Sequence, residues 1–175
     1  KIPQVAVFDT SFHQTMEPKV YMFALPYEYY EKYSVRKYGA HGTSHHFVSD
    51  RVAVLENKDK KDLKIIVCHI GNGASITAVK DGVCCDTSMG FTPLDGFMMG
   101  TRTGTLDPSA LTFIAEKENL SPAQINDICN KKSGMLGVSG ISNDNRDVCA
   151  AADAGNERAK LAVDMQRYQI LKFVG

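Results

Sequence analysis

The sequence has no net charge at pH 7, because 20 lysine and arginine residues balance 20 aspartate and glutamate residues. This balance argues against a protein that holds nucleic acid or an anionic membrane by bulk electrostatics. Long apolar runs are missing too: no stretch approaches the roughly 18 consecutive apolar residues that a membrane helix needs, and we expect no signal segment. We therefore expect binding to neither nucleic acid nor a membrane.

The sequence also lacks CxxC pairs, which bears on disulfides and metals. Its cysteines are Cys68, Cys84, Cys85, Cys129 and Cys149. Their number is odd, two are adjacent, and most lie in apolar or strand-like segments, where an unpaired cysteine behaves as a small hydrophobic residue. The pattern argues against a disulfide framework or a zinc site and predicts a protein of the reducing cytoplasm.

An initiating methionine is missing as well, since the chain begins at Lys1 and runs for 175 residues. This length suits one ordinary domain, or a domain with a fragment of another, and is enough to bury a core. We expect the chain to be a piece of a longer protein.

Hydrophobic patterning predicts one strand and one helix in the first 60 residues. Residues 4–8 are typical of a short buried strand that places Asp9 at its carboxyl end, where ligands collect in open α/β sheets. Thr43 or Ser44 can cap a helix. One face of that helix would carry Phe47, Val48, Val52 and Leu55.

Further along, the pattern changes to that of strands and then to that of helices. Three apolar segments separated by tight turns cover residues 64–70, 74–79 and 83–87, and Asp81-Gly82 is a strong hairpin signal. After a glycine-rich loop over residues 88–105, helices are predicted to begin at Asp107-Pro108 and Ser121-Pro122 and to cover residues 144–154 and 157–173. An antiparallel meander followed by helices predicts a layered α/β domain.

Two of the loops are suited to binding anions. His69-Ile70-Gly71-Asn72-Gly73 joins two strands, and its glycines would leave backbone N–H groups open to a phosphate, although it can equally be a simple turn. It is not a P-loop, because no Gly-Lys-Ser/Thr follows. Arg102 lies between threonines and glycines and has the form of an anion clamp, or it is a solvent-exposed loop arginine.

Two further loops lead into helices. Residues 41–46 hold three histidines, and His41 and His45 are spaced i, i+4; no zincin glutamate lies between them, so helix capping and anion contact are favoured over a metal site. Residues 139–147 could hold a ribose or purine through their carboxylate and guanidinium groups, or form an ordinary capped helix. Together with Asp9, the four loops supply the kinds of residue that phosphoryl transfer needs.

These segments resemble the acetate kinase family (acetokinases), the acyl-phosphate-forming kinases of the actin-like ATPase superfamily. The matching stretches, in order along the chain, are Val7-Phe8-Asp9-Thr10-Ser11, His41-Gly42-Thr43-Ser44-His45, His69-Ile70-Gly71-Asn72-Gly73, Asp86-Thr87-Ser88-Met89-Gly90, Met99-Gly100-Thr101-Arg102 and Ser139-Gly140-Ile141-Ser142. The resemblance implies an actin-like ATPase (ribonuclease H-like) α/β domain, with a mixed sheet that contains the antiparallel meander. It assigns residues 1–12 to the end of a first domain and residues 13–175 to most of a second. Because family members are longer, the fragment alone is expected to be inactive.

The resemblance also implies the reaction: transfer of the γ-phosphoryl group of ATP to acetate, giving acetyl phosphate and ADP, with Mg²⁺, in a homodimer. It assigns Asp9 to positioning Mg²⁺ and substrate, if need be through water, His41 to contact with the phosphoryl group, and Arg102 to the active site. The implied nucleotide residues are His69, Ile70, Gly71, Asn72, Gly73, Asp144, Asn145 and Arg146. The implied acyl pocket includes Pro93 and Ala40.

Ala40 departs from the family pattern, which usually has phenylalanine there, and Thr103 and Thr105 stand where serine and aspartate are usual. The first departure leaves a propionate or butyrate kinase of the same family as an alternative. A sugar kinase of the superfamily would need Asp9 to deprotonate a hydroxyl group. A non-catalytic nucleotide-binding module is a third alternative, against which the combination of Asp9, His41 and Arg102 argues.

Overall fold

The computed structural model of the chain describes residues 2–175, which form two units. Unit 1 contains the residues up to His69 together with Ser75–Pro93, and unit 2 contains Ile70–Ala74 and Leu94–Gly175. Each unit is described by itself. The division at residue 12 between two actin-like domains stays a prediction.

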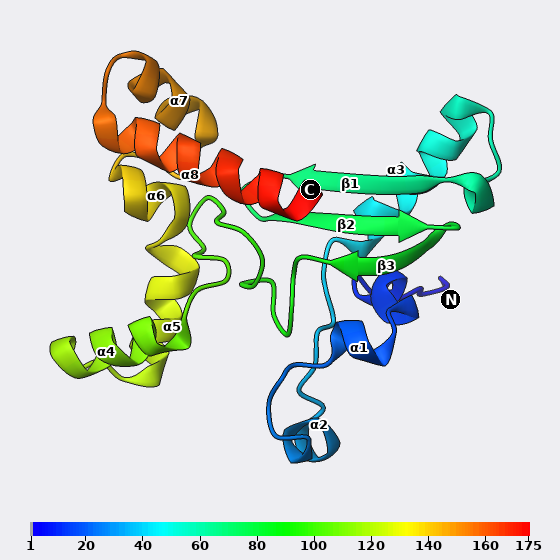
Figure 1. The fold of residues 1–175 in the computed structure, drawn as a ribbon, viewed down its shortest axis with the longest axis horizontal. Coiled ribbons are helices and arrows are strands. Elements are labelled where there is room, and N and C mark those ends of the chain that lie inside the picture. Colours follow the sequence, from blue (N-terminus) through cyan, green and yellow to red (C-terminus); the bar gives the residue numbers. More distant parts are fainter. Residues whose placement is uncertain (1) are drawn as a thin grey trace. The chain divides into compact units, whose positions relative to one another are not determined.

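A three-stranded sheet forms the centre of unit 1. Its strands β1 (Lys64–Ile70), β2 (Ala74–Lys80) and β3 (Val83–Thr87) lie in sequence order and alternate in direction (Figure 1). The β2–β3 turn is Asp81-Gly82, with φ angles of 56° and 77°, the two positive values that a type I′ hairpin requires. The predicted meander and the α/β class are confirmed.

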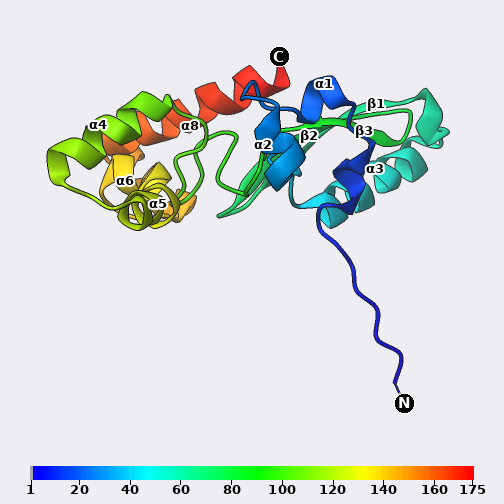
Figure 2. The same ribbon diagram turned by 90° about the horizontal axis from the view of Figure 1, so that it is seen from below.

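Helix α3 (Gly42–Glu56) covers one face of this sheet (Figure 2), but its cap and its buried face differ from the prediction. His41 is the N-cap and neither threonine nor serine caps the helix with its side chain. The buried residues are Gly42, His45, Ser49 and Ala53, whereas the side chains of Phe47 and Leu55 are 70% and 68% exposed. This face is turned to the sheet because the His45 ring bonds Ser75 of β2, so a tertiary contact overrides the apolar pattern.

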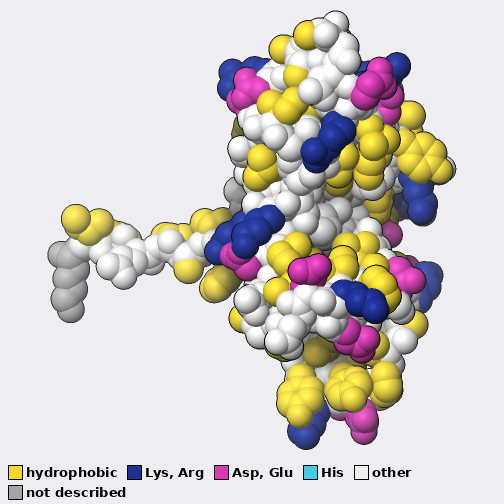
Figure 3. All heavy atoms as spheres, turned by 90° about the vertical axis from the view of Figure 1, so that its left-hand side faces the viewer, with side chains coloured by type: hydrophobic (Ala, Val, Ile, Leu, Met, Phe, Trp, Pro, Cys, Tyr) yellow, Lys and Arg dark blue, Asp and Glu magenta, His cyan; other side chains and the backbone are white. Residues whose placement is uncertain are grey.

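The predicted strand at residues 4–8 is wrong. This segment is extended and exposed and pairs with no strand among residues 2–175, as Figure 2 shows. Its hydrophobic side chains are visible along the projecting segment in Figure 3, and Val5 is 85% exposed. A strand is stabilised by the ladder and the cross-strand pairs that a neighbour supplies, and an apolar sequence without that neighbour stays extended chain.

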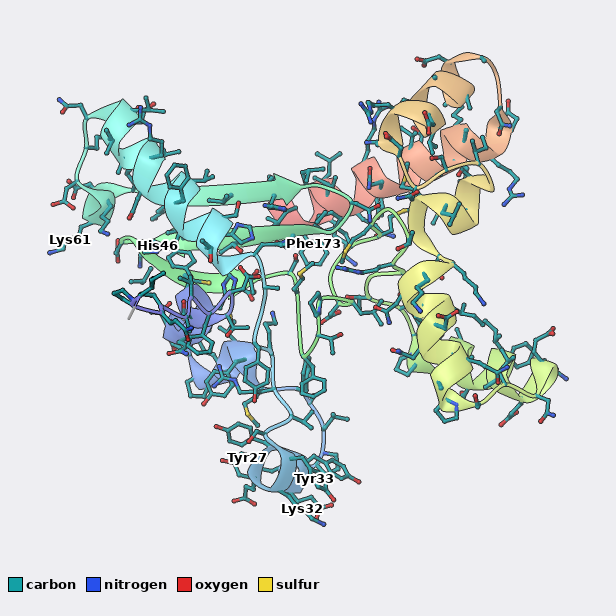
Figure 4. The ribbon with its side chains drawn as sticks, turned by 180° about the vertical axis from the view of Figure 1, so that it is seen from behind. Tyr27, Lys32, Tyr33, His46, Lys61 and Phe173 are labelled. Carbon is teal, nitrogen blue, oxygen red and sulfur yellow. The ribbon has the colours of Figure 1, made fainter. Side chains whose placement is uncertain are left out.

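Four short helices of unit 1 were not predicted. They are η1 (Ser11–Thr15), α1 (Pro18–Tyr21), α2 (Glu28–Tyr33) and η2 (Lys60–Asp62). None exceeds two turns, so none contains enough residues to show a 3.6-residue period. Tyr27 and Tyr33 mark the position of α2 in Figure 4.

Unit 2 consists of helices that follow the long glycine-rich loop. They are α4 (Pro108–Glu118), α5 (Pro122–Lys131), α6 (Gly134–Ser139), α7 (Asn145–Asp153) and α8 (Glu157–Val174). The predicted starts are confirmed: the Asp107 side chain caps α4, and Ser121 and Gln124 form a capping box on α5. Helix α6 was not predicted, because its glycine and serine content hid a six-residue helix.

The core of unit 2 lies where α8 packs against α6 and α7 (Figure 1). Its buried members are Met98, Met135, Val148, Ala159, Ala162 and Val163. Helix α8 also holds the glycine-rich loop, because the Gln169 side chain accepts a 2.7 Å hydrogen bond from the Met98 backbone N–H. Along residues 2–175 no helix is both long and apolar enough to cross a membrane.

Candidate functional site

Asp9 holds the N-terminus of α3. Its carboxylate accepts hydrogen bonds from the backbone N–H groups of His41 at 2.6 Å and Thr43 at 3.4 Å, and its carbonyl oxygen accepts one from Gly42 at 2.9 Å. A Cβ at Gly42 would collide with that carbonyl group, so only glycine permits this approach. The predicted catalytic aspartate therefore lies at the positive end of the helix dipole.

His41 adopts a backbone conformation that is uncommon for a residue with a side chain. Its φ angle is 58°, in the left-handed region. Its ring stacks on His69, with ring centroids 4.0 Å apart, and its Nδ1 atom lies 2.8 Å from Oγ of Ser75. Ser75 is on β2 and fully buried. Within unit 1 the stacking on His69 and the hydrogen bond to Ser75 thus help to hold the ring.

Two more histidines are buried beside His41. His45, on the next turn of α3, places Nε2 2.7 Å from the same Ser75 oxygen, and burial together with the neighbouring histidines lowers its pKa to about 4. Burial also lowers the pKa of His13. Within the described part of the chain, no three His, Cys, Asp or Glu side chains are grouped so that they could hold a metal ion. His13 and His45 are therefore neutral imidazoles at pH 7.

Ala40, a predicted pocket residue, is buried in unit 1 with 8% of its surface exposed. Its carbonyl oxygen accepts a 2.9 Å hydrogen bond from Nε2 of His13. Two residues earlier, Tyr38 contacts Phe91, with ring centroids 6.2 Å apart. Pro93, the other predicted pocket residue, lies at the end of unit 1. Tyr38 of this aromatic pair is thus close in sequence to Ala40, where the resemblance implies a phenylalanine.

A cleft of about 290 Å³ in unit 2 brings two predicted nucleotide segments together. Its lining residues are Ile70, Gly71, Asn72, Gly100, Met135, Asn143, Asp144, Asn145 and Gln166. Five of these were predicted, and the predicted residues His69, Gly73 and Arg146 are not part of the lining. No pattern in the sequence pointed to Met135 and Gln166, which reach the cleft from helices α6 and α8.

Asn72, in the lining of this cleft, is held by hydrogen bonds to two other loops. Its side-chain oxygen accepts a 2.8 Å bond from Asn143, and its carbonyl accepts a 3.0 Å bond from the Gly100 N–H. Within its own loop, the Gly71 N–H donates to the Gly73 carbonyl at 3.2 Å. A Cβ at Gly100 would collide with the Asn72 side chain. Gly100 and Asn143 thus hold Asn72 in place within the predicted nucleotide loop, residues 69–73.

Asp144 and Arg146, at the start of α7, bind each other. The guanidinium places Nη2 2.6 Å from Oδ2 of Asp144, and Asp144 caps the helix by accepting from the Arg146 N–H. The Arg146 side-chain hydrogen bond lowers the pKa of Asp144 to about 2. Asp144 is therefore a full carboxylate acceptor at the rim of the cleft.

Arg102 lies in the glycine-rich loop of unit 2. Its carbonyl oxygen accepts from the Met99 N–H at 3.0 Å, and its Nη1 lies 3.7 Å from the Met99 sulfur. The backbone N–H of Thr103 donates to the carbonyl oxygen of Cys129. The hydroxyl group of Thr105 donates to the carboxylate of Asp95. Thr105 therefore holds this loop through its own side chain, whereas the bond from Thr103 is made by its backbone.

Comparison with known proteins identifies the family to which the chain belongs. The sequence profile of the Acetokinase family matches residues 1–175. The chain belongs to the Acetokinase family. Acetate kinase from Dictyoglomus thermophilum is 60% identical over 174 residues, which make up 99% of this chain and 44% of that protein. The chain therefore spans less than half the length of the curated relatives it matches.

Two solved structures of the family have the same fold. The crystal structure of Porphyromonas gingivalis acetate kinase superposes with a TM-score of 0.95 at 53% identity, over 97% of this chain and 42% of that one. A propionate kinase from Francisella tularensis superposes equally well, with a TM-score of 0.95 at 49% identity, over 99% of this chain and 44% of that one. At similar sequence identity, one of these relatives is thus named an acetate kinase and the other a propionate kinase.

Proposed function

We propose that the full-length enzyme containing this chain transfers the γ-phosphoryl group of ATP to acetate, giving acetyl phosphate and ADP. The observation that carries the proposal is the unit 2 cleft, where the Ile70–Asn72 loop meets the start of α7. Asn72 bonds Asn143, 71 residues further along the chain, and both segments match the family's nucleotide loops. Membership of the Acetokinase family supports the same reaction.

The cleft is suited to the adenosine part of the nucleotide. Its volume of about 290 Å³ is near the lower end of the range for small-molecule sites. Asp144 supplies a carboxylate that can accept from ribose hydroxyl groups, and the side-chain amides of Asn72 and Asn145 both donate and accept. The Gly71-containing turn lets phosphate approach the backbone without interference from a side chain.

The transfer step needs positioning and charge neutralisation more than proton transfer. A carboxylate oxygen of acetate forms a bond to the γ-phosphorus while the bond to the β-phosphate oxygen breaks, and ADP leaves. Acetate is already ionised at pH 7, since carboxyl pKa values are about 4, so the reaction requires no general base. We assign His41 to hydrogen bonding with a phosphoryl oxygen and Arg102 to neutralising the charge that develops on the transferred group.

Asp9 suits a role beside Mg²⁺. Mg²⁺ is usually held by one or two carboxylates, substrate phosphates and several waters, and it neutralises charge on the β- and γ-phosphates when bound. Asp9 is exposed, and each carboxylate oxygen that accepts one backbone N–H keeps a second lone pair. These features fit one ligand position, directly or through water.

The acyl substrate has a second candidate. Ala40 replaces a phenylalanine, and a propionate kinase is 49% identical to this chain; both observations favour propionate beside acetate. The sugar kinase alternative requires Asp9 to act as a base towards a hydroxyl group, and membership of the Acetokinase family argues against it. A binding module would have no use for the combination of Asp9, His41 and Arg102.

The test is ATP-dependent formation of acyl hydroxamate by the full-length enzyme, with acetate, propionate and butyrate compared at equal concentration. We expect turnover with acetate, stoichiometric ADP release, and loss of turnover in Arg102→Ala. Lys131→Ala, which changes an exposed cation on α5 of the same unit, is the matched control and should behave like wild type. ATP binding without hydroxamate from any of the three acids would support the binding module instead.

A further inference from the structure

Ser75 lies between the rings of His41 and His45 and bonds both. Its Oγ is 2.8 Å from Nδ1 of His41 and 2.7 Å from Nε2 of His45. The residue is fully buried on β2 (0% exposed), so solvent does not compete for its hydroxyl group. Because a hydroxyl group has one proton, Ser75 donates one of these bonds and accepts the other. The direction of the pair decides which ring nitrogen of His41 carries a proton.

His45 sets that direction through its other nitrogen. Among residues 2–175, Nδ1 of His45 is the one buried side-chain N or O atom with no hydrogen-bond partner. A neutral imidazole carries its proton on one nitrogen and accepts with the other. A proton on Nδ1 would leave a buried N–H donor unpaired, and such orphaned donors are rarer in proteins than orphaned acceptors. The proton therefore belongs on Nε2, and His45 donates to Ser75.

A charged His45 would not change the direction, but it is disfavoured in any case. Burial is the main cause of its pKa of about 4, and the nearby rings of His13, His41 and His69 lower the pKa further. The neighbouring Asp9 acts in the opposite sense and is outweighed. At neutral pH the ring has one proton, and the bonding pattern places it on Nε2.

His13 provides an internal reference for the same reasoning. Its Nε2 lies 2.9 Å from the carbonyl oxygen of Ala40, which can only accept, so Nε2 carries the proton. Its Nδ1, which lies 3.2 Å from the sulfur of Cys84, is then the nitrogen without a proton. Burial raises the pKa of Cys84 to about 12, so the thiol keeps its proton.

We infer that His45 and Ser75 form a relay that holds His41 as its Nε2–H tautomer. Nε2–H of His45 donates to Ser75, the Ser75 hydroxyl donates to Nδ1 of His41, and the ring proton of His41 is thereby placed on Nε2. The relay rests on the proposed function, because a phosphoryl oxygen only accepts and so needs a donor from His41. Ser75 and His45 are positioning residues: they act through His41.

The direct test is the tautomer of each histidine in the full-length enzyme, read by long-range ¹H–¹⁵N NMR at neutral pH on protein labelled with ¹⁵N-histidine. His41→Gln and His45→Gln identify the signals of the two rings. We expect both rings, and His13 as the reference, to carry the proton on Nε2. A proton on Nδ1 of either His41 or His45 overturns the relay.

Substitutions then show whether the relay acts on turnover. Ser75→Ala should convert His41 to a mixture of tautomers and lower kcat by roughly 10-fold, the lower end of the effect of removing a residue that orients a working histidine, with an unchanged KM for ATP. His45→Leu should do the same. In His45→Gln the side-chain amide can donate in place of Nε2, so it should keep the tautomer and most of kcat.

Wild-type kcat and tautomer in both Ser75→Ala and His45→Leu would show that the relay is wrong. The NMR measurement on wild-type protein decides the direction of the bonds even where a variant does not fold. A failure of the proposed function has a different signature: folded wild-type enzyme would make no acyl phosphate while its histidines show the expected tautomers.

Discussion

The carboxylate of Asp9 accepts a 2.6 Å hydrogen bond from the backbone N–H of His41, a residue 32 positions further along the chain. Because His41 makes no side-chain cap of its own, Asp9 supplies the cap of α3 from a distant segment. The same contact places a carboxylate beside the histidine that we assign to the phosphoryl group. Asp9 therefore has a structural role as the cap of α3 and a proposed chemical role beside the phosphoryl group. Substitutions can separate the two roles.

Replacing Asp9 with asparagine and with alanine makes that separation. Asn keeps an acceptor for the N-terminus of α3, whereas Ala removes it at a cost of about 1 kcal/mol, as at other N-caps. We expect Tm to fall more in Asp9→Ala than in Asp9→Asn, and turnover to be lost in both, since both lack the charge. Thermal unfolding and the hydroxamate assay measure the two effects. Wild-type turnover in Asp9→Asn would remove Asp9 from the chemistry.

Arg102 should matter for kcat more than for binding. Its guanidinium is assigned to charge that develops during transfer, so Arg102→Ala should reduce kcat by roughly 10²–10³-fold, as the loss of one preorganised donor does. Arg102→Lys should restore little, because an ammonium group cannot reproduce a planar fork. Steady-state kinetics with acetate and ATP test this, and a change confined to KM would assign Arg102 to substrate binding alone.

The buried His45 should make the protein less stable in acid. Burial is the first cause of its folded pKa of about 4, against 6.5 for an ordinary histidine. Between these values the unfolded chain binds a proton that the folded chain does not, so stability falls as the pH falls from about 6.5 to about 4 and is unaffected above that window. The full effect is at most roughly 3 kcal/mol.

The measurement is Tm of the full-length enzyme across pH 4–8, in wild type and in His45→Gln, whose amide does not titrate. We expect the wild type to lose more Tm in acid than the variant does. Equal losses in the two proteins would show that His45 is not the group responsible.

The elements that could be predicted from sequence are those whose signals are local. Asp81-Gly82 requires positive φ angles and has them, and the side chains of Asp107 and Ser121 cap the helices that they precede. Each of these signals depends on a few consecutive residues, and at these positions no distant contact overrides it.

The parts that could not be predicted depend on distant partners. Which face of α3 is buried depends on hydrogen bonds such as that between His45 and Ser75, 30 residues apart, and the apolar pattern pointed to another face. In the cleft, Met135 and Gln166 come from helices whose own sequences show only a packing pattern. Residues 4–8 have the sequence of a strand, but they pair with no strand among residues 2–175 and remain extended chain.

Gly100 should be needed for nucleotide binding because of the space it leaves. A Cβ at this position would push the Asn72 side chain away from Asn143. We expect Gly100→Ala to raise the KM for ATP with little change in that for acetate. Asn143→Ala removes the bond to Asn72 without adding an atom, and should produce a smaller effect of the same kind. An equal rise in both KM values would point to general disruption of the loop.

Ala40 should set the acyl chain length. A phenylalanine here would narrow the pocket that we assign to the acyl group, and one methylene in an apolar pocket typically discriminates by about 1–3 kcal/mol. We expect the wild type to use propionate well beside acetate, and Ala40→Phe to shift the ratio of kcat/KM towards acetate. Because Ala40 is buried and Tyr38 and Phe91 already contact each other nearby, the added ring must displace a neighbour, and Tm has to be measured alongside. If a stable Ala40→Phe enzyme shows wild-type ratios for acetate, propionate and butyrate, the aromatic pair occupies that space and Ala40 does not line the pocket.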